Sequence, residues 1–198
     1  EIISASAKRF VIKRIAEESI DDFPMVLRRI FLLINEMIDS FIESCRNNSV
    51  EMLRSNEFQH DNTKRFINFC LRLLNKYGHK DSKKTDFYFN VISMLSKSED
   101  IIKNHARMMI KHEIRLKSKK SSEALEDIRK SIKMFYELYY SFDWIKVAEL
   151  NRQRDDFRDK LLRNTKEMSK GECLLIGGLS QIIELILDMT ETRMAMEE

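Results

Sequence analysis

The stretch FYFNVISMLSKSEDIIKNHARMMIKHEIR, which runs from Phe87 to Arg115, decides the expected fold. Its apolar residues recur at helical rather than strand spacing, and Ser98 and His105 lie within the apolar stripe. On another face, basic residues follow at steps of four and form one basic line: Lys103, Arg107, Lys111 and Arg115. A similar stretch, LLIGGLSQIIELILDMTETRMAM, returns near the C-terminus. We therefore expect two long apolar helices that other helices cover.

The composition favours long helices in one domain, or in two small bundles that share a core. The 198 residues include four glycines and one proline, far below the averages of about 7% and 5%. The net charge is only +3, and the pI is about 8.7. A dedicated nucleic-acid-binding domain typically has a pI above about 9.

The three cysteines, Cys45, Cys70 and Cys173, are far apart and show no metal or disulfide spacing. This usage favours a reducing cytoplasm, with each thiol a small buried apolar group. No run approaches the roughly 18 apolar residues that a membrane-spanning helix needs, so no membrane span is expected.

Breaks in the apolar pattern divide the chain into a short N-terminal segment and six helices. Residues 1–23 form an irregular or strand-like segment, with a candidate strand over 9–16, and fit the end of an upstream domain. The expected helices span about 24–46, 49–77, 87–115, 122–141, 144–167 and 172–196. Residues 24–198 are thus predicted to be an all-α six-helix bundle of two three-helix repeats, about 24–118 and 119–198, with the third helix of each repeat in the middle.

Local signals support these boundaries. Pro24 suits the first turn of a helix, and Asn48 with Glu51 three residues later resembles a capping box. Gly78 is a natural helix stop, and Asp143 is a candidate cap.

Few residues suggest catalysis. No nucleophile elbow, phosphate loop, zinc-protease helix or dinucleotide fingerprint occurs, and the histidines lack paired ligand spacing, so the sequence predicts a protein that is not an enzyme. His105 is expected to be a satisfied interhelical residue. The pair Gly177–Gly178 indicates close helix packing or a kink, and close packing is the preferred interpretation.

Asp100 and Glu184 are the candidate metal-binding residues. Asp100 follows Leu95 at the same spacing as Glu184 follows Leu179, so the two carboxylates occupy corresponding places in the third and sixth helices. Paired carboxylates from facing helices hold divalent or ferric ions in helical bundles. The alternative is that both are surface or interhelical ion-pair residues.

The basic line is the candidate partner-binding surface, for an acidic protein, phosphate or nucleic acid. The alternative is a solvated helix face. Glu99 stands four residues before Lys103, in the favourable order for a local ion pair.

Three stretches carry a resemblance to a known family: LRRIFLLINEMIDSFIES at 27–44, KRFINFCLRLLNKYGHKDSKKTDFYFNVISMLSKSEDIIKNHARMM at 64–109 and LSQIIELILDMTETRMAME at 179–197. With the two-by-three helix plan they resemble the phosphate-uptake regulator family PhoU, especially its archaeal type, over most of the chain from Leu27 on. In archaeal relatives such a domain often follows an AbrB/SpoVT-like DNA-binding domain, which the N-terminal segment would fit.

The resemblance implies a cytoplasmic regulator of high-affinity phosphate transport that is not an enzyme. It implies contact with the ATPase of the transporter or with another signalling protein, and a homodimer through an exposed apolar face is plausible. The alternative is the sensing or dimerisation domain of a transcription regulator that reaches nucleic acid only through an upstream domain. A third reading is a metal-binding carboxylate bundle with redox chemistry.

The resemblance also implies metal clusters held by E/DxxxD motifs on the second and third helices of each half, and here these motifs are altered. The corresponding pairs are Ser96 with Asp100, Ser180 with Glu184, His60 with Lys64, and Asn151 with Asp155 or Arg152 with Asp156. A lysine or arginine in a ligand position opposes a cation. At most a reduced site is therefore expected around Asp100 and Glu184.

Overall fold

The computed structural model of the chain describes residues 2–6, 9–12 and 19–197. Strands β1 (Ile2–Ser6) and β2 (Arg9–Ile12) pair antiparallel, with Ala5 opposite Phe10. The strand expected over 9–16 is thus confirmed over its first four residues, and residues 13–16 lie outside the described residues.

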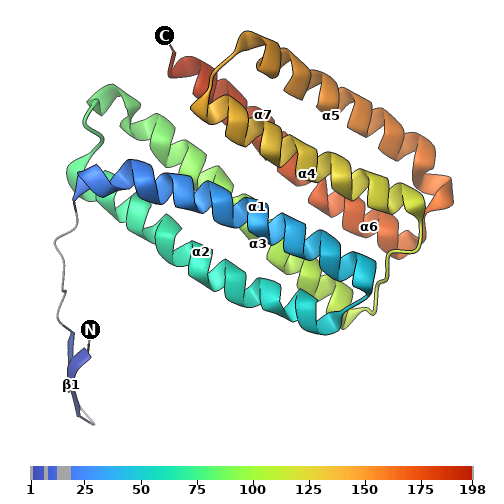
Figure 1. Cartoon of the computed structure of the whole chain (residues 1–198), viewed down its shortest axis with the longest axis horizontal. Helices are drawn as coiled ribbons and strands as arrows, with labels where there is room; N and C mark the ends of the chain where they lie inside the picture. Colours follow the sequence, from blue (N-terminus) through green and yellow to red (C-terminus); the bar gives the residue numbers. More distant parts are fainter. Residues whose placement is uncertain (1, 7–8, 13–18, 198) are drawn as a thin grey trace.

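The described chain from residue 23 on forms the predicted all-α bundle of two three-helix repeats (Figure 1). The helices of the first repeat are α1 (Phe23–Asn47), α2 (Val50–Tyr77) and α3 (Thr85–Lys111). Those of the second are α4 (Lys119–Tyr140), α5 (Trp144–Asn164), α6 (Lys170–Leu179) and α7 (Gln181–Ala195). Helices α6 and α7 form one rod interrupted at Ser180, and this rod is the sixth helix of the prediction.

Local chemistry sets the helix ends, and one predicted cap is shifted by a residue. Ser49, not Asn48, caps α2 by accepting the backbone N–H of Met52, whereas Asn48 closes α1 with a φ of 49°. Gly78 ends α2 with a φ of 68°, as predicted. Asp143 caps α5, also as predicted.

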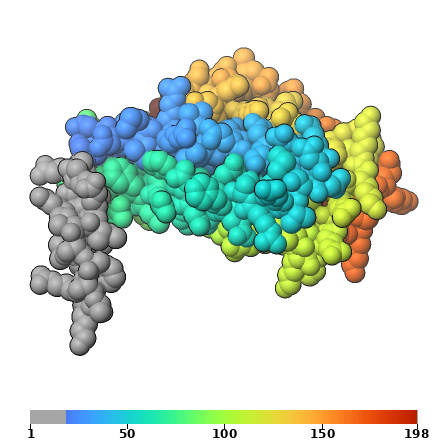
Figure 2. Space-filling view, turned by 60° about the horizontal axis from the view of Figure 1, so that its bottom comes forward, coloured from blue at the N-terminus to red at the C-terminus, as the bar shows by residue number. Residues whose placement is uncertain are grey.

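The two repeats meet along four helices rather than two. Helices α3 and α7 pack together as predicted, but α1 and α4 also contact each other. Helix α1 is deeply buried along its apolar face, for example at Ile30, Met37, Ile38 and Phe41. Helices α2 and α5 flank this four-helix core, and Figure 2 shows α1 and α2 side by side along the length of the molecule.

Close packing at the glycine pair confirms the preferred interpretation of that motif. A Cβ atom on Gly178 would lie 1.9 Å from Nε2 of His105, whereas one on Gly177 would meet nothing within 4 Å. The His105 ring is held by its Nδ1, which lies 2.7 Å from the carbonyl oxygen of Ile101. Gly178 thus lets α6 approach α3, and His105 is the satisfied interhelical residue that the sequence predicted. The helical rod is also interrupted two residues later, at Ser180.

One helical rod of the described chain, Lys170–Ala195, is long and apolar enough by length and composition to cross a membrane. The sequence prediction of no span did not anticipate this. Core helices of soluble proteins meet the same criterion, and 50% of the most apolar window is buried inside the bundle. Its contact with α3 through Gly178 makes it a core helix here.

Candidate functional site

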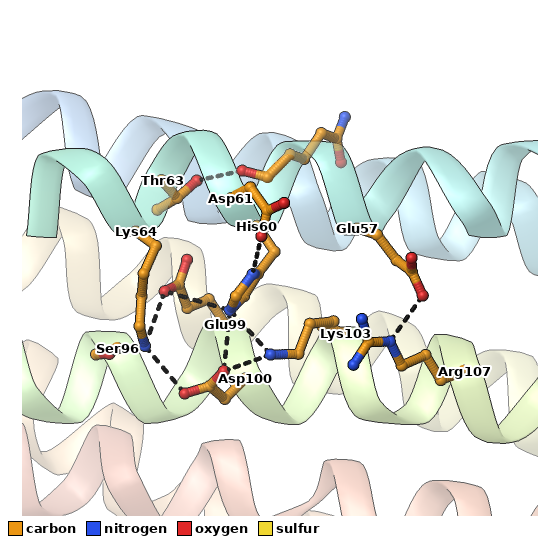
Figure 3. Close-up of polar contacts among 11 residues, drawn as sticks. Glu57, His60, Asp61, Thr63, Lys64, Ser96, Glu99, Asp100, Lys103 and Arg107 are labelled. Atoms are coloured by element: carbon orange, nitrogen blue, oxygen red, sulfur yellow. Dashed lines mark hydrogen bonds and ion pairs between the residues drawn. The ribbon is translucent and has the colours of Figure 1, made fainter. Parts of the chain in front are cut away.

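Charged side chains gather between α2 and α3 in the first repeat, and Figure 3 shows them as a connected network. We name this set the polar cluster. Its members are His60 and Lys64 from α2, and Ser96, Glu99, Asp100 and Lys103 from α3. Because residues three or four apart share one face of a helix, each helix presents its members to the other.

Asp100 lies at the centre of the polar cluster. Nζ of Lys103 lies 2.8 Å from Oδ1, Nε2 of His60 lies 2.9 Å from the same oxygen, and Nζ of Lys64 lies 3.0 Å from Oδ2. Burial acts to raise the pKa of Asp100, but the hydrogen bonds from Lys103, Lys64 and His60 together outweigh it, and the pKa falls well below the usual carboxyl range. The carboxylate is therefore ionised and compensated by cations of the protein itself.

Glu99 is the fully buried carboxyl group beside Asp100. Nζ of Lys64 lies 3.4 Å from its Oε1, an ion-pair contact, but neither oxygen accepts a well-formed hydrogen bond from the described residues. Burial raises the pKa of Glu99 to about 8, and the Lys64 ammonium opposes that rise. The ion pair with Lys103 expected from sequence is not formed, because Lys103 turns to Asp100 one residue further on.

His60 completes the polar cluster from α2. Its Nδ1 lies 3.1 Å from Oδ1 of Asp61, and its Nε2 lies 3.1 Å from Nζ of Lys103 as well as close to Asp100. Because one ring nitrogen cannot donate and accept at the same time, Nε2 either donates to Asp100 or accepts from Lys103. Either arrangement holds the ring between the two helices.

The second repeat places its corresponding carboxylate, Glu184, in a simpler and more exposed pair. Nε and Nη2 of Arg158 lie 3.1 Å and 2.7 Å from the two carboxylate oxygens, which is a bidentate contact between α5 and α7. The side chains of Arg158 and Glu184 are 53% and 44% exposed. Of the other altered motif residues, Asp155 pairs with Arg154 and Asn151 donates to the carbonyl oxygen of Val147.

These surroundings do not fit a metal ion. Two ammonium groups contact Asp100 and a guanidinium covers Glu184, so positive charge already stands beside both carboxylates. The described residues contain no group of three or more His, Cys, Asp or Glu side chains that could hold a metal ion. The prediction of a reduced metal site at Asp100 and Glu184 gains no support from this geometry, and a metal titration decides it.

The predicted basic line is divided by the structure. Lys103 is engaged in the polar cluster, and Arg107 donates through Nε to Oε1 of Glu57 at 2.7 Å. Helix α3 ends at Lys111, so Arg115 lies in the connection to α4 and not on the helix as expected. Only Arg107 and Lys111 remain as exposed basic residues of this line on α3 itself.

Sequence reasoning did not identify the roles of Glu99 and Glu172. Glu99 continues the apolar register of Leu95 and Ile102, and this spacing was a signal of burial. Glu172 is buried, and its two oxygens accept the backbone N–H groups of Lys117, Ser118 and Ser169, each at 2.8 Å. The Ser169-x-x-Glu172 spacing of a capping box was its signal.

Comparison with known proteins places the fold. No family model and no curated protein matches the sequence. Among solved structures, the chain is similar to the phosphate transport system regulatory protein PhoU from Streptococcus pneumoniae, with a TM-score of 0.67 and 11% identity over 90% of this chain and 94% of that one.

Two structures from Shewanella oneidensis MR-1 are also similar. A putative PhoU-like phosphate regulatory protein gives a TM-score of 0.56 at 10% identity, over 84% of this chain and 94% of that one. A PhoU-like protein gives 0.56 at 11% identity, over 91% and 96%. Identity this low shows the fold alone, and the fold of this chain is PhoU-like.

Proposed function

We propose that this chain regulates phosphate transport or phosphate signalling through protein–protein contacts in the cytoplasm. The observation that carries the proposal is the likeness to PhoU over 90% of the chain, which includes both three-helix repeats. The sequence resemblance over 27–44, 64–109 and 179–197 supports the same role independently of the coordinates. The archaeal type and an upstream AbrB/SpoVT-like domain remain predictions of that resemblance.

The polar cluster supports a structural or binding role and not a catalytic one. Its cations and Asp100 contact one another, so they hold α2 against α3. A catalytic acid or base needs to reach the group from which it takes a proton, or to which it gives one. Here the basic and acidic atoms are directed into the helix interface (Figure 3).

A surface on the outer side of α2 and α3 is the proposed contact site for the partner. Phe58 is 78% exposed. Its neighbour Glu57 binds Arg107 of α3, and Lys111 follows one turn later on the same helix. An exposed aromatic ring on α2 and exposed cations on α3 would together suit an acidic surface with an apolar centre, such as a transporter ATPase could provide.

The test is affinity capture of the tagged chain from its native cells, with mass spectrometry of the recovered proteins. We expect a phosphate-transporter ATPase or a phosphate-signalling protein to be enriched. The Phe58→Glu variant should lose this partner. Met25→Glu, at a methionine of α1 that is 68% exposed, is the matched control and should retain it. Equal capture by both variants would place the contact elsewhere.

The alternative function is the sensing or dimerisation domain of a transcription regulator. The β1–β2 hairpin supports this alternative, because it precedes the helical bundle and does not belong to the PhoU-like repeats. Recovery of DNA or transcription machinery without a transporter component would favour this alternative.

A further inference from the structure

Two segments that are far apart in sequence carry a concentrated positive charge. Residues 111–120 (KHEIRLKSKK) and 160–170 (KLLRNTKEMSK) together contain nine lysines and arginines and only two glutamates, Glu113 and Glu167. The whole chain carries a net charge of only +3, so the rest of the molecule is acidic overall. The two segments thus carry a net charge of +7, against −4 for the rest of the chain.

The fold brings these two segments together at one end of the bundle. Glu172 binds the backbone N–H groups of Lys117 and Ser118 on one side and of Ser169 on the other. A Cβ atom on Gly171 would lie 3.4 Å from the Ile114 side chain, so the start of α6 also packs on the first segment. Figure 2 shows the yellow-green connection before α4 and the orange start of α6 at the same end of the elongated molecule.

Apolar side chains stand among these cations. Leu162 near the end of α5 and Leu174 in α6 are 74% and 59% exposed. Lys117, Lys166 and Lys170 are exposed and form no ion pair within the described part of the chain, and Lys119 has only a 3.9 Å contact with Glu123. We name Lys117, Lys119, Lys166 and Lys170, with Leu162 and Leu174, the basic end.

We propose that the basic end docks the protein on the surface of a membrane that contains anionic phospholipids. Clusters of four to eight lysines and arginines bind anionic headgroups, and leucines beside them enter the boundary between headgroups and acyl chains. A planar surface can meet this one end of the elongated bundle without contacting its sides. Binding of nucleic acid rests chiefly on phosphate contacts and base readout, so the exposed leucines favour a lipid surface.

This surface has a different partner from the one proposed for Phe58, and it does not depend on that partner. Vesicles contain no transporter, so a lipid assay can fail while capture of the ATPase succeeds, and the reverse also holds. If both hold, the basic end would bring the regulator to the membrane in which a phosphate transporter resides.

The experiment is co-sedimentation of the full chain with phosphatidylcholine vesicles, with and without roughly 30% phosphatidylglycerol, a content that gives the negative surface potential of a cytoplasmic leaflet. We expect binding only to the anionic vesicles, weakening as salt rises. Reversal of four charges, in Lys117→Glu/Lys119→Glu/Lys166→Glu/Lys170→Glu, should lower the partition at least about tenfold, since each basic residue contributes separately to the attraction.

The opposite end of the bundle offers a matched control. Lys76, Lys80, Lys83 and Lys84 lie around the connection between α2 and α3 (Figure 1), and the same four-fold reversal there should leave most binding intact. Leu162→Gln/Leu174→Gln should remove the part of the binding that resists salt, while circular dichroism reports that the helices persist.

Three outcomes would overturn the proposal. The first is equal loss of vesicle binding in both charge-reversed variants, which would mean non-specific attraction. The second is absence of binding to anionic vesicles at low salt. The third is tight binding to a duplex oligonucleotide with no vesicle binding, which would assign the basic end to nucleic acid.

Discussion

Each of the two repeats pairs a carboxylate with a cation of the protein, but at different depths below the surface. In each, the third helix of the repeat carries a carboxylate at the corresponding position, Asp100 or Glu184, and the preceding helix supplies a cation, Lys64 or Arg158. In the first repeat this pair belongs to a half-buried cluster that also encloses Glu99. In the second repeat it is one exposed bidentate pair. Cations of the protein thus act as counter-ions in both halves, at a half-buried site in the first repeat and at an exposed one in the second.

The second helices of the two repeats, α2 and α5, also differ in how many of their residues are buried. Helix α2 buries eight residues, and the polar members of this set are Asn56, His60 and Thr63. Helix α5 buries only Val147, Leu150 and Phe157, and shallow cavities of about 300 Å³ and 330 Å³ lie between it and α4. The first repeat is therefore the more firmly assembled half, and α5 is the helix expected to detach first.

The largest effect is expected at the glycine pair, which only the second repeat has. When Leu95 is aligned with Leu179, the residue of the first repeat that corresponds to Gly178 is Met94. Gly178→Ala should lower the free energy of unfolding by about 1–3 kcal/mol, the usual cost of overpacking, because its methyl group would overlap the His105 ring. Urea unfolding measures this.

Gly177→Ala is the matched control, because a Cβ atom there meets nothing within 4 Å. It should raise stability by up to about 1 kcal/mol through helix propensity. Adding His105→Ala to Gly178→Ala should restore part of the loss. If the double variant were no more stable than Gly178→Ala alone, the steric explanation would fail.

Glu172 should have the next largest effect. The corresponding residue in the first repeat is Tyr88, whose ring packs on Phe23 and His79 at centroid distances of 5.2 Å and 4.4 Å. Glu172 instead binds three backbone N–H groups that join the repeats. Glu172→Gln should cost about 2 kcal/mol at neutral pH, since hydrogen bonds to a charged group are worth about 1.5–3 kcal/mol each.

The pH dependence of this loss has a defined sign. Burial acts to raise the pKa of Glu172, but the N–H groups of Ser118, Ser169 and Lys117 outweigh it and lower the pKa from 4.5 to about 2. A lowered carboxyl pKa gives stability that is present above the unfolded pKa and is lost as pH falls through the folded one. The difference in free energy of unfolding between wild type and Glu172→Gln should shrink below about pH 4.5 and nearly vanish near pH 2. A difference that stays constant with pH would refute the role of the ionised Glu172 carboxylate.

A third prediction compares the two counter-ions directly, beginning with Lys64. Lys64→Met should lower the free energy of unfolding by about 1–2 kcal/mol, because it removes the hydrogen bond to Asp100 and the ammonium group in contact with Glu99. We set this below the 3–5 kcal/mol typical of a fully buried pair, since the Lys64 side chain is 33% exposed. Adding Glu99→Gln should recover stability, and failure to do so would separate Glu99 from the role of Lys64.

Arg158→Met in the second repeat should cost less, at most about 1 kcal/mol, because exposed ion pairs contribute about 0–1 kcal/mol. Thermal unfolding at low and high salt checks this, since screening should remove most of the difference. If Arg158→Met proved as costly as Lys64→Met, the two repeats would not differ in the way that their burial indicates.

The sequence predicted the fold well because the information was local and periodic. The apolar register of 87–115 gave α3, and Gly78 and Asp143 marked helix boundaries through their own backbone chemistry. The last helical turn of α3 was overextended to Arg115. The turn at 112–114 has no glycine or proline, and Glu113 reaches a φ of 51° despite its side chain.

The candidate site was predicted only in part. The positive charge of Lys64 predicted that it opposes a metal ion, and in the structure its ammonium group binds the Asp100 carboxylate. Glu99 shares the apolar register of Leu95 and Ile102, which indicates burial, but Glu99 and Asp100 point in directions only about 100° apart on a helix, so this register alone does not fix how far each carboxylate enters the interface. The rotation of α3 against α2, a property of tertiary packing, decides that Glu99 faces inward.

The smallest expected effect is the response to metal, and it tests both repeats at once. With Lys64 and Lys103 on Asp100 and Arg158 on Glu184, a divalent or ferric ion would have to displace a protein cation in either half. We expect no stoichiometric manganese, zinc or iron by elemental analysis, and a change in Tm with EDTA of less than about 1 °C, because a ligand that does not bind cannot shift stability.

Lys64→Glu removes one cation and adds a carboxylate beside Glu99 and His60, so it should bind manganese where Arg158→Glu, on the exposed pair, does not. Stoichiometric metal in the wild-type protein would instead restore Asp100 and Glu184 as ligands, with Lys64 and Arg158 turned away.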